Sequence, residues 1–90
     1  MTGTITAVHD TPHGISVAVR HGPTETRLEL HRYAATQLRR LFKDGMVGQR
    51  IEAEPGALTI GPFIFGLELD TTTSTPETEW FALETPRRVG

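Results

Sequence analysis

The sequence predicts a small α+β domain in which a strongly bent, antiparallel sheet surrounds one amphipathic helix. Apolar and polar residues alternate in the first third of the chain, follow a helical period in one central stretch, and alternate again beyond it. Short turns rich in glycine and proline separate the alternating stretches, which favours antiparallel pairing of consecutive strands. The expected order is therefore β-β-β-α-β-β-β-β, with the sheet curving toward a barrel.

Three strands are expected before the helix. They cover Thr4–His9, Ile15–Arg20 and Glu25–Leu30, and each shows a two-residue alternation. The intervening clusters, Asp10–Gly14 and His21–Thr24, contain the glycine and proline residues that form turns. The three strands should therefore form a meander.

The helix is expected near Arg32–Asp44. Its apolar face lies at positions i, i+4, i+7 and i+8 and consists of Ala34, Leu38, Leu41 and Phe42. Gly45 stands where a helix commonly ends in a left-handed residue. The start is less clearly marked, because His31 is not among the favoured N-cap residues.

Four strands are expected after the helix. They cover Gln49–Glu54, Ala57–Ile60, Phe63–Leu69 and Trp80–Glu84. The order of residues in Pro55-Gly56 suits the centre of a type II turn. Gly61-Pro62 permits two interpretations, a second tight turn or a kink within one long strand.

The chain is expected to form a single domain over residues 1–90. That length suffices for one modest core without disulfide or metal staples. The segment Asp70–Glu79 contains no apolar residue and should be a mobile, threonine-rich loop. Pro86–Gly90 is expected to be a short tail.

The composition excludes several classes of chemistry. The chain has no cysteine, which rules out disulfide frameworks, thiolate metal sites and cysteine nucleophiles. No secretory signal is visible, and the longest apolar stretch, Phe63–Leu69, is too short to span a bilayer. We therefore expect a cytoplasmic protein without a membrane partner. No cofactor is expected, because the sequence lacks a phosphate-binding loop and a dinucleotide fingerprint.

The leading hypothesis is a non-catalytic protein-binding or regulatory module, with a homodimer as one form. Residues 1–50 hold seven basic and four acidic side chains, whereas residues 51–86 hold seven acidic ones and no basic one, which favours a partner or self-association. Apolar residues also fall on both faces of the later strands, and a second layer must cover them. The predicted interface residues are Ile64, Trp80 and Phe81. The cover could be a second protomer or closure of the sheet into a single-chain barrel.

The first alternative is a nucleic-acid-binding regulator that uses the basic face of the helix. Cationic side chains on one helix face can bracket phosphates. The candidate residues are Arg32, Arg39, Arg40 and Lys43. The sequence pI near 6.0 argues against this function, since basic nucleic-acid modules lie well above it.

The second alternative is a metal-dependent enzyme at a cluster of histidines. In a meander, the end of the first strand, the first turn and the end of the third strand meet at one end of the sheet. His9, His13 and His31 would gather there with Asp10, and imidazole with carboxylate is a suitable ligand set for a divalent metal. No recognised metal or catalytic spacing supports this cluster, so a catalytic role is not expected.

Overall fold

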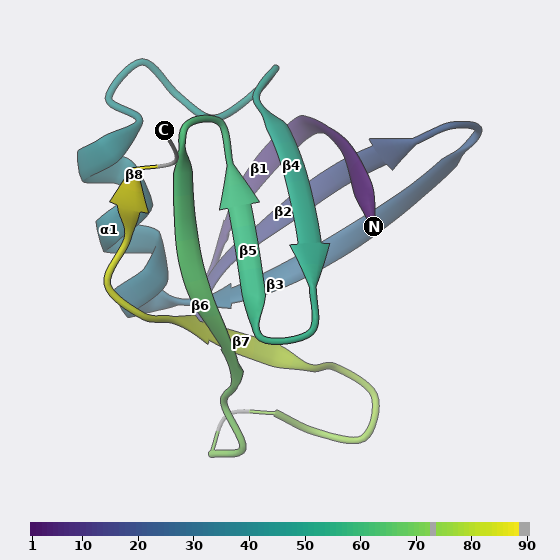
Figure 1. The fold of residues 1–90 in the computed structure, drawn as a ribbon. Helices are drawn as coiled ribbons and strands as arrows, with labels where there is room; N and C mark the ends of the chain where they lie inside the picture. Colours follow the sequence, from purple (N-terminus) through teal and green to yellow (C-terminus); the bar gives the residue numbers. More distant parts are fainter. Residues whose placement is uncertain (73, 89–90) are drawn as a thin grey trace.

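The computed structural model describes residues 1–72 and 74–88 and is an α+β fold of one short helix and a strongly bent, eight-stranded sheet (Figure 1). The elements in chain order are β1 (Thr2–Thr11), β2 (Gly14–His21), β3 (Thr24–His31), α1 (Arg32–Leu41), β4 (Arg50–Glu54), β5 (Ala57–Ile60), β6 (Phe63–Leu69), β7 (Trp80–Leu83) and β8 (Arg87–Arg88). No helix in this described part of the chain is long and apolar enough to cross a membrane.

The sheet closes on itself. Its order is β5-β4-β1-β2-β3-β7-β6-β8, and β5 also pairs with β6. Strands β1 to β7 therefore form a ring. β8 pairs with β6 alone, at Phe63 and Ile64, whereas β7 pairs with β6 at Leu67–Leu69. Of the two covers considered from the sequence, the fold uses closure of the sheet within one chain.

The expectation of a purely antiparallel sheet is wrong at one place. β3 and β7 run parallel and pair through Glu29 with Trp80 and through Leu30 with Phe81. The ring contains an odd number of strands, seven, so strand direction cannot alternate all the way round it. One parallel pair is the minimum, and it occurs where β7 closes the ring.

The two-residue turns are as the sequence predicts, and the ambiguous one is resolved. Glu54 pairs with Ala57 across Pro55-Gly56, and Gly56 has a φ of 79°, as a type II turn requires. Ile60 pairs with Phe63, so Gly61-Pro62 is a turn between two strands and not a kink within one.

Helix α1 begins where predicted and ends earlier, at Leu41 instead of Asp44. His31 is the N-cap, because its Nδ1 accepts a hydrogen bond from the backbone N–H of Tyr33 at 3.3 Å. The His31 imidazole thus caps the N-terminus of the helix, a role in which serine, threonine, aspartate and asparagine are favoured. Ala34 and Leu38 are buried as expected, and α1 packs against β2, β3 and β7.

Two segments differ from the predicted loop and tail. Arg87 and Arg88 form β8 and pair with Ile64 and Phe63, while residues 89 and 90 of the predicted tail lie outside the described residues. In the threonine-rich loop, Ser74 Oγ accepts from the N–H of Trp80 at 2.8 Å and donates to its carbonyl at 3.2 Å. The loop is thereby joined to the start of β7; its residue 73 lies outside the described part.

The core is the interior of the barrel, closed by α1. Its largest fully buried side chains come from β1, β2, β3, α1, β4, β5 and β6 and are Ile5, Ile15, Val17, Val19, Leu30, Leu38, Ile51, Leu58, Ile60 and Phe65. Aliphatic β-branched residues dominate this list, which suits the pleated inner wall of a small barrel. Gly14 is also buried. The backbone of β3 approaches it so closely that a Cβ at this position would overlap the carbonyl oxygen of Leu30.

Replacing Gly14 with alanine should therefore lower the free energy of unfolding by more than about 3 kcal/mol. The neighbouring atoms are backbone and cannot move aside without displacing β3. The matched control is Gly66→Ala, where a Cβ meets only side-chain atoms of Glu84. The Glu84 carboxylate can rotate away and its Cβ must shift slightly, so a smaller loss of about 1 kcal/mol is expected. Urea unfolding followed by circular dichroism measures both changes, and equal effects at the two positions would contradict this account of β2 and β3 packing.

Candidate functional site

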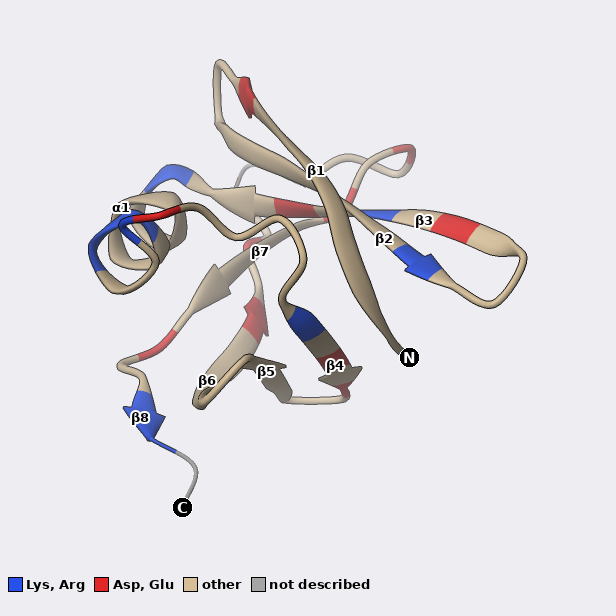
Figure 2. Ribbon diagram, turned by 90° about the horizontal axis from the view of Figure 1, so that it is seen from above, with Lys and Arg blue, Asp and Glu red and all other residues tan. Residues whose placement is uncertain are grey.

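The candidate functional site is the unpaired edge of β3. One edge of β3 pairs with β2 along its whole length, from His31 to Thr24. The other edge pairs with β7 only at Glu29 and Leu30. Over Thr24–Leu28, no strand within the described residues covers this second edge. Figures 1 and 2 show that this part of the β2–β3 hairpin extends beyond the barrel, where another chain can reach it.

The turn of the hairpin decides which backbone groups face that edge. Gly22-Pro23 is a two-residue connection, and Gly22 has a φ of 62°, so His21 and Thr24 close the hairpin as a hydrogen-bonded pair. Such pairs recur at every second residue of an antiparallel ladder. The N–H and C=O groups of Glu25 and Arg27 are therefore directed away from β2, toward the free edge.

The side chains of the same two residues add alternating charge to the edge. Residues paired directly across strands share a face, so Glu25 lies beside Arg20 and Arg27 beside Ala18. Glu25 and Arg27 are both exposed. Charged side chains on an exposed edge strand oppose indiscriminate pairing with other chains. The edge is therefore open to a partner whose charges match this pattern.

The predicted interface residues lie elsewhere, and their own chain largely covers them. Trp80 is paired with Glu29 on the outer face of the barrel, yet it is only 8% exposed. The His13 ring packs edge-on against it at a centroid distance of 5.6 Å. Phe81 faces inward and packs against the core, and Ile64 is half-buried. The interface hypothesis assumed a second chain over an open sheet, whereas here the closed barrel and the His13 loop provide the cover.

The predicted metal ligands do not come together as a set. Among residues 1–72 and 74–88, no group of three or more histidine, cysteine, aspartate or glutamate side chains could hold a metal ion. His9 is paired with Ser16 on the outer face, and His13 contacts Trp80. His31 has its Nε2 3.6 Å from a carboxylate oxygen of Asp70 while its Nδ1 caps α1. His31 thus links the helix start to the loop before β7.

Within residues 1–72 and 74–88, Ser16 is the one buried polar residue. It is 4% exposed, and its hydroxyl donates to Glu29 Oε1 at 2.9 Å. A nucleophilic serine must be accessible and must give its proton to a base within reach of a substrate. Ser16 instead is buried and donates its hydroxyl hydrogen bond to the Glu29 carboxylate. Its role is therefore structural.

Arg32, Arg39 and Arg40 of α1 are exposed, as predicted, and so is Lys43, which follows the end of the helix at Leu41. Figure 2 marks the basic positions of the helix ribbon in blue. The Arg39 guanidinium donates to the Asp10 carboxylate and forms an exposed ion pair with it. The Arg32 guanidinium lies 5.8 Å from the ring centroid of Tyr33, which is 71% exposed. This face of α1 therefore combines positive charge with one accessible aromatic ring.

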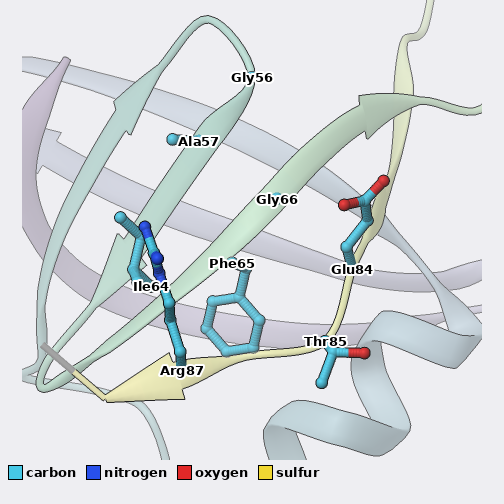
Figure 3. A pocket seen from close by; sticks show the side chains of 8 residues that line it. All are labelled: Gly56, Ala57, Ile64, Phe65, Gly66, Glu84, Thr85 and Arg87. Carbon is cyan, nitrogen blue, oxygen red and sulfur yellow. The ribbon is translucent and has the colours of Figure 1, made fainter.

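A shallow hollow lies over β5 and β6 (Figure 3). Its volume is about 270 Å³, and its lining residues are Gly56, Ala57, Ile64, Phe65, Gly66, Glu84, Thr85 and Arg87. Figure 3 shows Glu84 and Arg87 on opposite sides of an apolar floor. Small-molecule sites are usually more enclosed and measure roughly 300–1,000 Å³, so this hollow is a weaker candidate than the β3 edge.

No family model matches the chain, and neither the curated proteins nor the solved structures contain a match to it.

Sequence reasoning missed the β3 edge, although part of its signal is local. The alternation Glu25-Thr26-Arg27 marks a strand that is polar on its outer face. The missing information is the place where β7 stops pairing with β3, which depends on the register of two strands far apart in the sequence.

The surroundings of Trp80 predict that Trp80→Ala will act on folding rather than only on association. Removing a buried indole should lower the free energy of unfolding by about 3–5 kcal/mol. Leu69→Ala is the control, because Leu69 is 40% exposed and its truncation should cost about 1 kcal/mol or less. Urea unfolding of the two variants at matched protein concentration measures the difference, and a Trp80→Ala variant as stable as wild type would contradict the burial.

Proposed function

We propose that the chain is a non-catalytic protein-binding module that takes up an extended segment of its partner along the β3 edge. The observation that carries this proposal is the free edge at Thr24–Leu28, on a hairpin that extends beyond the barrel (Figure 1). In strand addition, main-chain hydrogen bonds supply affinity and the alternating side chains supply specificity. The barrel is then the rigid support, and the hairpin is the recognition element.

The position of the edge supports this function. The hairpin extends beyond the barrel (Figure 1), so a partner strand can approach without rearrangement of the core. The residues that direct backbone groups toward the partner, Glu25 and Arg27, also present side chains of opposite charge. A partner with the complementary order of charges gains cross-strand pairs, whereas one with like charges is rejected.

A proline at position 27 tests this proposal. Arg27 directs its N–H to the free edge, so Arg27→Pro should remove one donor from the edge and leave the β2–β3 ladder intact. We expect peptides selected against the wild-type chain from a random displayed library to bind this variant at least tenfold more weakly. Arg27→Ala, which keeps the N–H, is the matched control and should retain more of the binding. Titration calorimetry with the selected peptides measures each Kd.

A second proline variant checks the assignment of backbone groups. Thr26→Pro removes a donor that faces β2, so it should lower the melting temperature far more than Arg27→Pro does. Selected peptides that bind Arg27→Pro as tightly as wild type would contradict the proposal. Peptides that perturb the amide resonances of a different face would contradict it as well.

A nucleic-acid function is a second candidate, and the exposed Tyr33 is the observation that favours it. An accessible aromatic ring beside arginine is a typical stacking platform for a single-stranded base. Arg32 lies 5.8 Å from this ring. Arg40 adds positive charge on α1, and Lys43 adds it two residues beyond the end of the helix at Leu41. In this function, the helix face holds the phosphates and Tyr33 stacks on a base.

Charge reversal at Arg40 and Lys43 tests the second candidate. If the helix face holds phosphates, Arg40→Glu with Lys43→Glu should abolish binding to a single-stranded oligonucleotide at low salt. The control is Arg87→Glu with Arg88→Glu, which changes the net charge equally at β8, on a different element. Fluorescence anisotropy over a salt series measures both variants. A wild-type chain that shows no binding at low ionic strength would end this candidate.

A further inference from the structure

We propose that the strand taken up by the β3 edge is β3 of a second copy of this chain, in an antiparallel pair with its two-fold axis at Thr26. This inference rests on the proposed function, because it requires the same free edge. A two-fold axis brings the same segment of both copies together and runs them antiparallel. The two barrels then share one continuous sheet across the pair of β3 strands.

The backbone groups restrict the register to a few choices. Edge-facing residues must lie opposite edge-facing residues for their N–H and C=O groups to bond. Within Thr24–Leu28 these residues are Glu25 and Arg27, so the axis can pass through Glu25, Thr26 or Arg27. Each choice places a different set of side chains in direct opposition.

Charge selects the register at Thr26. With the axis at Glu25, that carboxylate faces its own symmetry mate, and with the axis at Arg27, two guanidinium groups face each other. Like charges directly opposite one another destabilise a strand pair. With the axis at Thr26, Glu25 of each copy lies opposite Arg27 of the other, so both cross-strand pairs are of opposite charge.

The length of the free edge fits the same register. The edge begins after the turn at Gly22-Pro23 and ends where β7 pairs with Glu29. An axis at Thr26 places Thr24 of one copy opposite Leu28 of the other and uses this whole segment without reaching β7. An axis at Arg27 would place Glu25 opposite Glu29, whose edge β7 already occupies.

The pair should be reversible and dependent on concentration. Only a short strand is shared, and interfaces below about 1,200 Å² in total belong to the weak, transient class. Screened surface ion pairs contribute modestly, so association should also weaken as the salt concentration rises.

Complementary charge reversals test the register directly. Glu25→Arg gives a chain with arginine at both positions, and Arg27→Glu gives one with glutamate at both. Each variant alone should be a monomer over a concentration series in which the wild type dimerises. The two variants mixed in equal amounts should form a heterodimer, because every opposed pair is again of opposite charge. The double variant Glu25→Arg with Arg27→Glu should recover a homodimer.

Sedimentation velocity over a dilution series measures the mass of each sample, and circular dichroism checks that each variant is folded. Arg50→Glu, at an exposed site on β4, is the control for a general effect of charge and should leave the wild-type dimer intact. A wild-type mass of one chain at every concentration would overturn the proposal. A dimer that both single variants retain would also overturn it, since another surface must then form it.

The sedimentation data, combined with the peptide titrations described above, distinguish an error in the self-pairing proposal from an error in the proposed function. A monomeric wild type whose selected peptides still lose affinity in Arg27→Pro would refute self-pairing while the edge keeps its binding role. If self-pairing is correct, hydrogen exchange of the Glu25 and Arg27 amides should slow at high protein concentration, whereas exchange of the Thr26 amide, already bonded to β2, should change little.

Discussion

The odd number of strands in the ring is the constraint on which the rest of the structure depends. A closed sheet of seven strands must contain a parallel pair, and here that pair joins β3 to β7. The pairing covers only two residues of each strand, because β7 approaches β3 at its helix-proximal end and then continues along β6. The remaining length of β3 keeps a free edge, so barrel closure and the candidate binding surface have one cause.

The parallel pair of β3 and β7 also explains why Trp80 is buried although it lies on the outer face of the barrel. Strand register puts this side chain on the outside of the barrel, opposite Glu29. His13 packs on its ring, and Ser74 bonds to its backbone. Trp80 is therefore covered on the outer face although it does not belong to the barrel core. His31 extends this arrangement to α1 and to Asp70, so helix, loop and closing strand are held together around one junction.

Local pattern predicted most of the elements, because hydrophobic period and turn chemistry are local properties. The three strands before the helix and the turn at Pro55-Gly56 follow from residues close together in the sequence. The parallel pairing of β3 and β7 could not be predicted in this way, because it is a property of ring closure. The end of α1 at Leu41 differed from the predicted Asp44, although Gly45 was a fair sign that a helix terminus was near.

The site was harder to predict than the fold. Exposure of the helix arginines followed from helical spacing, and the structure places them on the surface as expected. The burial of Trp80 could not be read from the sequence, since an outward-facing aromatic is covered only if another segment folds over it. The histidines were expected to meet at one end of the sheet, but register gives each a different neighbour. Spacing along strands specifies a face, whereas a site needs the positions of side chains across several strands.

The closing strand β7 is synthesised about 50 residues after β3, so β3 lacks its parallel partner while the chain is being made. During synthesis, β3 is complete well before β7 exists, so its entire outer edge, including Glu29 and Leu30, is unpaired for that interval. Non-local pairings of this kind form slowly, and exposed strand edges promote misassembly in the meantime. The alternating charges on β3 would then have a protective role before any partner is present, because they disfavour pairing with neutral or like-charged strands of other proteins. The charged residues Glu25 and Arg27, which select a partner for the folded barrel, would thereby also limit aggregation of the partly synthesised chain.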